Sequence, residues 1–435
     1  MWCLISQPNS VIFEVRVDPK AIGQECLEKV CEHLGISNES DYFGLKYESS
    51  KGEELWLNLR NPIHRQVSCH GHTSPLRFAL RVKFWVPPHL LLQETTRHMF
   101  YLHAKLDLIE NRLLVPNWTV VAKLIALIAQ AESGDYNPLQ PPHHLYMQLS
   151  SISSTEVLHK PQDLLQMVIS EHEKREGMKP ATAQYWLLNE VAGLDNFGEE
   201  VFTSKSNIGI VIGVGPNGIT MYNKNEEKQI IPFTAIQSAT SHNRCFKLGY
   251  LSLDNVEAHL EIKLDSSQTA NGLYRAITEK HAFYSCETVG SAVTAQFIRD
   301  LKGTIVSIFN EDSTLGKKYV FDIRRTCREV YDNARRALYQ ESKMFQEIID
   351  GQRPECFEES RRGVSSSHER LTKIMDAMTC KICMDLQIDT AFLPCAHVVA
   401  CSSCAARCER CPLCRADITQ PQKIYLPEEF NEPIS

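Results

Sequence analysis

The feature that most constrains this chain is a dense run of cysteines near its C-terminal end. Eight of the 16 cysteines of this 435-residue chain lie between residues 380 and 414. With one histidine, seven of them follow the order Cys380-x2-Cys383-x11-Cys395-x-His397-x3-Cys401-x2-Cys404-x6-Cys411-x2-Cys414. Each Cys-x2-Cys pair can place two thiolates on one tetrahedral zinc ion, at a Zn–S distance of about 2.3 Å. Eight such ligands predict two zinc ions.

The rest of the sequence favours metal binding over a disulfide framework. The chain does not begin with a positively charged segment followed by an apolar core, and no apolar run reaches the roughly 18 residues of a membrane span. We therefore expect a cytoplasmic protein, whose thiols stay reduced. Because side chains fill every ligand position, the zinc ions are expected to be structural. The net charge of −7 argues against nucleic acid as a partner.

The first 83 residues predict a small sheet with one helix. Apolar and polar residues alternate from Val11 to Val17, after a turn at residues 8–10, which is typical of a half-buried strand in a hairpin. Apolar residues at helical spacing then run from Leu27 to Leu34 and stop at Gly35. Further strands are expected at 42–47, 55–59 and 76–82. A hairpin followed by a helix is how a ubiquitin-like β-grasp lobe begins.

Two further lobes follow, with different periodicities. Residues 84–182 carry apolar residues at helical spacing over 90–114, 120–131 and 161–176, which predicts an all-helical lobe. Residues 183–285 return to strands at 208–214, 219–222 and 258–264 and end in a helix at about 269–284. Strands covered by one long helix suggest a PH-like sandwich.

Two patterns in these lobes resemble sites but are better explained otherwise. Gly213-x-Gly215-x-x-Gly218 matches a dinucleotide-binding fingerprint, but a strand rather than a helix is expected to follow it, so we predict a hairpin. His172, between two glutamates, has no second ligand at metal-binding spacing, and we expect it at the surface.

A basic helix is expected within residues 286–339. Apolar residues from Cys327 to Leu338 form one helical face, and the opposite face carries Arg324, Arg328 and Arg335. Nearby lie Lys302, Lys317 and Lys318. This basic face either binds anionic membrane lipids or is simply solvated, and the sequence leaves both interpretations open.

The last part of the chain is expected to be a linker and the zinc-binding segment. Residues 340–366 are rich in glycine, proline, serine and charges without periodicity, which predicts a linker. Within residues 367–435, a capped helix should precede the cysteines and a strand at 423–426 should follow them. Their apolar faces need a partner, and a homodimer is the favoured one, with packing inside one subunit as the alternative.

The ligand order, with histidine in fourth place, resembles a RING finger. The resemblance implies a cross-brace in which Cys380, Cys383, Cys401 and Cys404 hold one zinc ion and Cys395, His397, Cys411 and Cys414 hold the other. It also implies that the finger binds a ubiquitin-conjugating enzyme charged with ubiquitin and positions its thioester for attack. The chain would then be a RING-type ubiquitin ligase with no covalent ubiquitin intermediate of its own.

The same resemblance assigns roles to residues around the ligands. Ile382, Pro412 and Leu413 are expected to be exposed apolar contacts for the conjugating enzyme. Cys408, which is not a ligand, occupies a further enzyme-facing position and is interpreted as a small apolar residue. Arg415 matches the position whose guanidinium bridges the enzyme and ubiquitin, and a solvated surface charge is the alternative.

The order of the three lobes resembles a FERM domain over about residues 1–285. Sequence words that support it are Asp41-Tyr42-Phe43-Gly44-Leu45, Trp56-Leu57-Asn58-Leu59, Phe84-Trp85-Val86-Pro87-Pro88 and Gly134-Asp135-Tyr136. The expected fold is therefore multidomain α+β: a three-lobed FERM domain, a helical extension, a linker and a RING finger. FERM followed by RING resembles ubiquitin ligases that act on lipoprotein receptors. This implies that the third lobe binds cytoplasmic tails of membrane receptors and that the chain associates peripherally with the plasma membrane.

Two residues of the last helix of the third lobe are candidates for tail contacts. Tyr274 and Thr278 lie four residues apart on one helical face and match receptor-contacting positions of that family. From the sequence they could equally be buried against the sheet. A different function also stays open, namely a FERM scaffold that links membrane proteins to cytoskeletal proteins and uses its zinc finger only for binding.

Overall fold

The computed structural model describes residues 1–67, 75–156, 161–203, 210–223, 228–252, 256–288, 323–351, 379–383 and 386–424. The predicted helix before the zinc ligands lies outside these residues, as do Lys302, Lys317 and Lys318. Among the described residues, no helix is both long and apolar enough to cross a bilayer.

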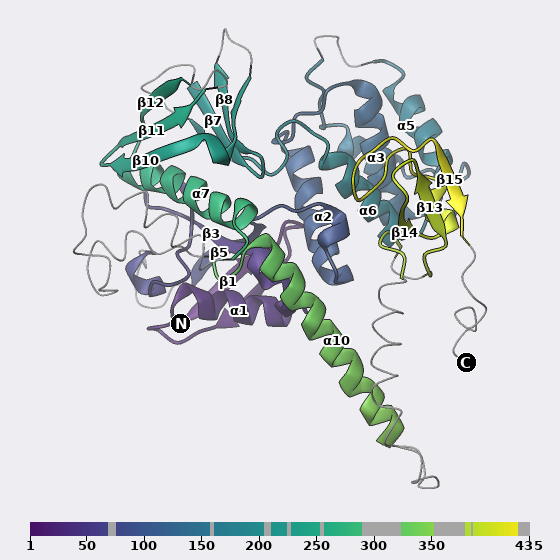
Figure 1. Cartoon of the computed structure of the whole chain (residues 1–435), viewed down its shortest axis with the longest axis horizontal. Coiled ribbons are helices and arrows are strands. Elements are labelled where there is room, and N and C mark those ends of the chain that lie inside the picture. Colours follow the sequence, from purple (N-terminus) through teal and green to yellow (C-terminus); the bar gives the residue numbers. More distant parts are fainter. Residues whose placement is uncertain are drawn as a thin grey trace.

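The N-terminal lobe is a five-stranded sheet with one helix packed on it, as the sequence predicts (Figure 1). β1 and β2 form the antiparallel hairpin, and β5 returns parallel to β1 in the sheet order β2-β1-β5-β3-β4. The helix α1 ends just before Gly35, whose φ of 68° suits glycine. The elements are β1 (Trp2–Ser6), β2 (Ile12–Arg16), α1 (Gly23–His33), the short helix η1 (Ser37–Tyr42), β3 (Phe43–Glu48), β4 (Glu54–Trp56) and β5 (Leu76–Val82).

The second lobe is all helical and begins with the short helix η3 (Pro88–Leu90). Its longer helices are α2 (Glu94–Ile109), α3 (Trp118–Ser133), α4 (His143–Leu149), α5 (Leu164–Glu173) and α6 (Pro180–Val191). The boundary predicted at 182/183 falls inside α6, and α6 packs against α2 and α3, so the helical layer continues to Val191. His172 is fully buried, contrary to expectation, because its Nδ1 accepts a hydrogen bond from Tyr146 and its Nε2 donates one to the Gly134 carbonyl (2.6 and 2.9 Å).

The third lobe is a strand sandwich closed by one helix. One sheet contains β6 (Glu200–Thr203), β7 (Ile210–Gly215), β8 (Gly218–Asn223) and β9 (Gln229–Ile231). The other contains β10 (Ile236–His242), β11 (Cys245–Leu251) and β12 (Glu257–Lys263), and α7 (Ser267–Ser285) packs on both sheets. Gly215 pairs with Gly218 across the β7–β8 turn, which confirms the hairpin in place of a dinucleotide loop.

Polar contacts join the third lobe to the N-terminal lobe and to the connection that follows it. Lys83 forms an ion pair with Glu279 of α7 at 2.6 Å, and both side chains are buried. The indole of Trp56 donates to Glu200, and the hydroxyl of Tyr284 donates to the carbonyl of Trp85 (3.0 and 2.9 Å). The third lobe and the N-terminal lobe are therefore joined by specific polar interactions, one of them a buried ion pair.

The helix α10 (Cys327–Gly351) runs away from the three lobes in Figure 1. It starts after Arg324, so this arginine is not part of the predicted helical face, and it continues well into the segment 340–366 that the sequence predicts as a linker. That segment is therefore partly helical, and the prediction of a linker overlooked Phe345, Ile348 and Ile349, which recur at helical spacing.

The cysteine-rich segment folds into a small three-stranded sheet and a helical turn. Its elements are β13 (Thr390–Leu393), β14 (His397–Ala400), α12 (Ser402–Ala405) and β15 (Gln420–Lys423), in the sheet order β14-β13-β15. The last strand lies three residues earlier than the predicted 423–426. This small sheet lies beside the helical lobe, near α3, α5 and α6 (Figure 1).

Candidate metal centre

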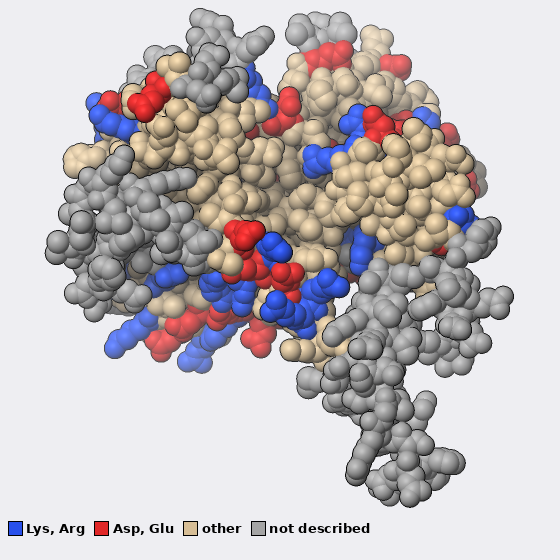
Figure 2. Space-filling model, viewed as in Figure 1, with Lys and Arg blue, Asp and Glu red and all other residues tan. Residues whose placement is uncertain are grey.

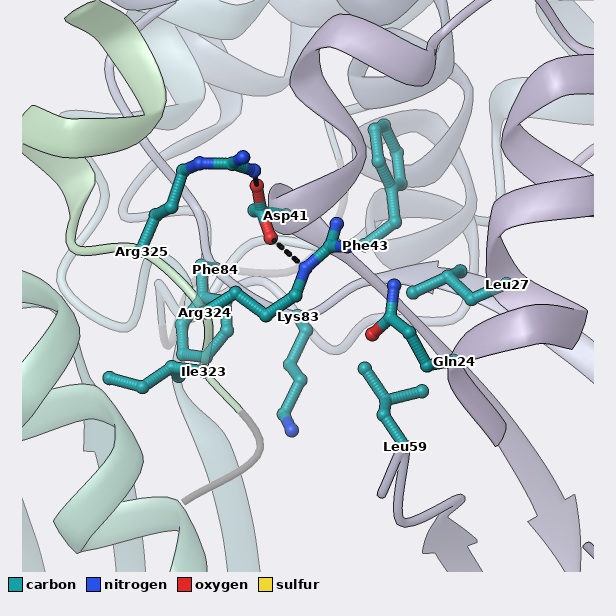
Figure 3. A pocket seen from close by; sticks show the side chains of 10 residues that line it. All are labelled: Gln24, Leu27, Asp41, Phe43, Leu59, Lys83, Phe84, Ile323, Arg324 and Arg325. Atoms are coloured by element: carbon teal, nitrogen blue, oxygen red, sulfur yellow. Dashed lines mark hydrogen bonds and ion pairs between the residues drawn. The ribbon is translucent and has the colours of Figure 1, made fainter. Parts of the chain in front are cut away.

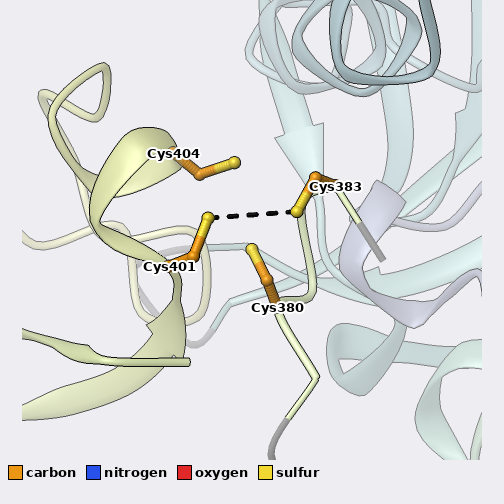
Figure 4. Close-up of side chains that lie close together, drawn as sticks. All are labelled: Cys380, Cys383, Cys401 and Cys404. Atoms are coloured by element: carbon orange, nitrogen blue, oxygen red, sulfur yellow. Dashed lines mark hydrogen bonds between the residues drawn. The ribbon is translucent and has the colours of Figure 1, made fainter. Parts of the chain in front are cut away.

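Four cysteine sulfurs from two parts of the segment converge on one point. Cys380 and Cys383 come from the loop before β13, and Cys401 and Cys404 lie at the start of α12 and within it. Their ligand atoms all lie within 4.8 Å of one another, and Figure 4 shows the four sulfurs turned toward a common centre. The sulfurs of Cys383 and Cys401 are 3.9 Å apart. Two sulfurs bound to one tetrahedral ion at about 2.3 Å would lie about 3.8 Å apart, so this set fits zinc.

The second group contains three cysteines and the histidine. Cys395, His397, Cys411 and Cys414 also place their ligand atoms within 4.8 Å of one another. The Nδ1 atom of His397 is buried and has no hydrogen-bond partner among the described residues. A buried ring nitrogen without a partner is costly unless it binds something, and a metal ion would satisfy it. The two sets interleave along the chain, in the same grouping as the expected cross-brace.

The donor chemistry supports two structural zinc ions. Each set supplies four side-chain ligands of the kinds that zinc prefers, thiolate sulfur and imidazole nitrogen. Four ligands close a tetrahedral site, so no position remains for a water or a substrate. Cys408 belongs to neither set; it is buried, and its thiol donates to the Cys404 carbonyl at 3.3 Å.

The apolar residues on the zinc loops differ from expectation in their exposure. Ile382 has no exposed surface and Pro412 is buried, whereas Leu413 is 47 % exposed. The physical reason for Ile382 is that the cysteine-rich segment packs on the helical lobe: an Nη atom of Arg97 in α2 donates to the Ile382 carbonyl at 2.9 Å, and Ile382 joins the same buried cluster as the side chains of that lobe. The expectation of exposed apolar groups is therefore wrong for Ile382 and Pro412.

Arg415 lies directly after the last ligand with its side chain exposed. Its backbone is left-handed, with φ of 60°, and its amide donates to the Cys411 carbonyl at 2.8 Å. This hydrogen bond closes the Cys-x2-Cys turn and fixes where the guanidinium leaves the zinc loop.

Arg97 is the residue at this contact that the sequence reasoning missed. It is 1 % exposed, although arginine is rarely buried unless it is paired. Its helical neighbours Phe100, Tyr101 and Ala104 are buried as well, so Arg97 belongs to the apolar face of α2. A charged residue on an apolar helical face is the signal that could have identified it.

The two candidate tail-contacting residues lie on α7 in different surroundings. Tyr274 is 8 % exposed and belongs to the core of the third lobe. Thr278 is half-buried, and its hydroxyl donates to the backbone carbonyls of Tyr274 and Arg275. Burial against the sheet, which the sequence left open, is thus the arrangement of Tyr274, and a receptor contact stays a prediction for both residues.

The predicted basic face is largely neutralised where it meets the N-terminal lobe. Arg324 binds Glu28 and Asp41 (2.7 and 3.0 Å), and Arg325 binds Asp41 at 2.7 Å, along a small pocket between this segment and the lobe (Figure 3). Figure 2 shows basic and acidic side chains intermixed around the start of α10. Arg324 is therefore an intramolecular contact rather than a free lipid-binding group.

Two other arginines of the predicted basic face are open to solvent. Arg328 lies 3.8 Å from Glu287 in a pair whose side chains are both largely exposed, and Arg335 is exposed. Lipid binding stays a prediction for Arg328 and Arg335.

Comparison with known families agrees with this arrangement. The FERM N-terminal domain family matches residues 5–69, the FERM central domain family matches residues 86–202, and the C3HC4-type zinc finger (RING finger) family matches residues 376–421. The fold is similar to that of the FERM and C-terminal domain complex of Drosophila Merlin, a crystal structure. The TM-score is 0.55 and the sequences are 20 % identical, and the match covers 65 % of this chain and 96 % of that one.

Relatives with similar sequences share only part of their length with this chain. The human tyrosine-protein phosphatase non-receptor type 14 is 30 % identical over 283 residues, which are 63 % of this chain and 23 % of the phosphatase. The Drosophila protein 4.1 homolog is 28 % identical over 282 residues, 64 % of this chain and 16 % of that protein. The chain thus combines FERM N-terminal and central domains, within a FERM-type fold, with a C-terminal RING-type zinc finger.

Proposed function

We propose that the chain is a RING-type ubiquitin ligase whose FERM domain selects membrane receptors by their cytoplasmic tails. The observation that carries the proposal is the pair of closed four-ligand sets, with Arg415 exposed directly after the last cysteine. Closed sets cannot activate water, so the finger would act by holding a charged conjugating enzyme in its reactive pose. A lysine of the receptor would attack the thioester, and no residue of this chain would act as a nucleophile.

The combination of domains supports a narrower substrate class. A FERM domain followed by a C-terminal RING finger resembles the inducible degrader of the LDL receptor, and by that resemblance the substrates are receptors of the lipoprotein-receptor type. The tail would bind beside α7 and the edge strand β10 of the third lobe. The resemblance further implies a peripheral position at the plasma membrane and a RING homodimer.

A ligation assay with purified components tests the proposed activity. The full chain should accelerate the discharge of ubiquitin from a charged conjugating enzyme to free lysine, and Arg415→Ala should reduce this acceleration at least about tenfold, because the bridging guanidinium is lost. Arg410→Ala is a matched control, since Arg410 is also an exposed RING arginine but pairs within the finger with Asp417 at 2.9 Å. The control should retain full activity.

The outcome separates the two candidate functions. If the wild-type chain discharges none of a panel of charged conjugating enzymes while binding receptor tails, the ligase proposal is wrong. The alternative, a FERM scaffold with a zinc finger used only for binding, would then be the better explanation.

A further inference from the structure

The RING-type finger is seated on the FERM helical lobe through a buried polar contact. The guanidinium of Arg97 donates to the backbone carbonyl of Ile382 at 2.9 Å, and the two residues are 1 % and 0 % exposed. Breaking this hydrogen bond without replacement would leave the buried carbonyl of Ile382 without this donor, which costs more than the same change at a surface. The contact is therefore specific, because a buried and directional hydrogen bond fixes the position of the finger on the lobe.

Apolar packing continues around this hydrogen bond. Ile382 and Cys408 of the finger belong to the same continuous cluster of buried side chains as Tyr185 and Phe100 of the helical lobe. At one rim, Arg407 donates to the Glu176 carbonyl at 3.5 Å.

A second rim lies near η3. Burial lowers the pKa of His89 to about 4, and the nearby charge of Arg415 adds to this effect. The finger is thus held at its centre by Arg97 and at one rim by Arg407, while near η3 Arg415 only comes close enough for its charge to act on His89.

The covered face is the one that the proposed function requires to be free. Ile382, Cys408 and Pro412 are all buried, whereas Leu413 and Arg415 remain exposed. A conjugating enzyme that contacts Ile382 and Cys408 cannot approach while Arg97, Tyr185 and their neighbours occupy the same surface. Two partners that need one surface exclude each other.

We propose that the helical lobe is a docking surface for the chain's own RING finger and competes there with the conjugating enzyme. This inference rests on the proposed ligase function for its consequence, but the docking itself does not. The finger binds the enzyme only after it leaves the lobe, so the apparent affinity for the enzyme is reduced by the fraction of chains that are open. If about one chain in ten is open, opening all of them raises the apparent affinity about tenfold.

Arg97→Met is the central variant for the test, because methionine replaces the unbranched aliphatic stem of arginine and removes the guanidinium that donates to Ile382. Arg407→Ala weakens the rim from the other side and, as an exposed position, does not endanger folding. Arg410→Ala again serves as the control, since no contact of Arg410 crosses to the helical lobe among the described residues. All variants are made in the full chain with zinc bound.

Two measurements are compared for each variant. Hydrogen–deuterium exchange at residues 379–383 and 94–101 reports docking without any enzyme, and we expect faster exchange at both segments in Arg97→Met and a smaller change in Arg407→Ala. The discharge of a charged conjugating enzyme reports the consequence, and at enzyme concentrations below saturation it should rise in Arg97→Met, by about tenfold for an open fraction of about one chain in ten in the wild type. Arg410→Ala should match the wild type in both measurements.

The two measurements distinguish the failure of this inference from the failure of the proposed function. Unchanged exchange at 379–383 in both Arg97→Met and Arg407→Ala would show that the finger is not docked in solution, and the inference would be wrong. Faster exchange with an unchanged rate of discharge would show docking without competition and would also overturn it. Faster exchange with no discharge by any variant, the wild type included, would leave docking established and contradict the ligase proposal instead.

Discussion

At the scale of single residues, the ion pair between Lys83 and Glu279 is the most consequential contact between the lobes. The two side chains are 7 % and 3 % exposed, and Arg275 also binds the Glu279 carboxylate at 3.0 Å. Burial alone would raise the pKa of Glu279, but the charges and hydrogen bonds of Lys83 and Arg275 outweigh it and lower this pKa to about 2. The carboxylate is therefore charged in the folded protein, and its two partners balance it.

We expect Glu279→Gln to lower the free energy of unfolding by about 3–5 kcal/mol at pH 7, because Lys83 would remain buried without its counter-ion. Glu261→Gln is the control: Glu261 pairs with Lys247 at 3.0 Å, but both are exposed, so a loss of about 0–1 kcal/mol is expected. Chemical denaturation measures both. Equal small effects would mean that the buried pair contributes no more than a surface pair.

The pH dependence of the Glu279 contribution has a definite sign. A carboxylate whose pKa is lower in the folded than in the unfolded chain stabilises fully above its unfolded pKa of about 4.3. The contribution then falls as the pH drops toward about 2. The difference between the wild type and Glu279→Gln should therefore shrink in acid, and it should not change between pH 6 and 8.

Sequence reasoning at this scale succeeded where chemistry is encoded in spacing and failed where it depends on distant neighbours. The eight zinc ligands follow from their order, because a Cys-x2-Cys turn fixes two of them locally. His172 and Ile382 were expected at the surface, but partners far along the chain bury them: Tyr146 and Gly134 in one case, Arg97 in the other. The residues adjacent in sequence do not predict such distant partners.

At the scale of elements, α7 is the helix on which receptor binding is expected to depend. It packs on both sheets of the third lobe with Tyr274 turned into their core and Thr278 hydrogen-bonded to its own backbone. A tail bound beside α7 would contact the helix surface, and the buried side chain of Tyr274 holds that surface in position against the sheets.

Tyr274→Ala should weaken the binding of a synthetic LDL-receptor tail peptide to the full chain at least about tenfold, because the cavity left by its buried ring would disturb the packing of α7 under the proposed tail-binding surface. Tyr250→Ala in β11 is the matched control, since Tyr250 is also 8 % exposed in the same core. Fluorescence anisotropy measures the affinity. Equal losses in the two variants would attribute the effect to general destabilisation and would mean that Tyr274 has no specific part in tail binding.

The start of α10 shows how element boundaries can be read from capping residues. Thr326 and Glu329 form a reciprocal cap, in which the Thr326 amide donates to the Glu329 carboxylate at 2.9 Å and the Glu329 amide donates to the Thr326 hydroxyl at 3.3 Å. Pro180 in the first turn of α6 is a comparable signal that the sequence-based boundary at 182/183 overlooked. The extent of α10 toward Gly351 also has a mark in the sequence, because Phe345, Ile348 and Ile349 continue the helical spacing of apolar residues beyond Leu338.

At the scale of the whole molecule, the three FERM lobes and the zinc-binding segment are stabilised in different ways. The FERM lobes bury an extensive apolar core, whereas the segment 379–424 is too short to fold on apolar burial alone and needs its metal ions. The sequence predicts both regions, but not that the finger sits on the helical lobe, because this depends on the match between two folded surfaces.

Metal analysis by mass spectrometry should find two zinc ions per chain. Cys395→Ala should reduce the content to about one, because a set with three ligands is left open, whereas Cys408→Ala should retain two, since Cys408 belongs to neither set. The two variants remove the same atom types from the same short segment. One zinc ion in the wild type, or an equal loss in both variants, would contradict the cross-brace.

The pair between Lys83 and Glu279 also determines how this chain can be divided for experiments. A fragment that begins at Glu200 would contain both sheets of the third lobe and α7, yet it would carry Glu279 without Lys83 and Glu200 without Trp56. The carboxylate of Glu279 would keep its ion pair with Arg275 but lose the one with Lys83, at the newly opened edge of the fragment. The third lobe is continuous in sequence, but a recombinant piece cut at its borders would be weakened beside α7, the helix proposed to bind the receptor tail.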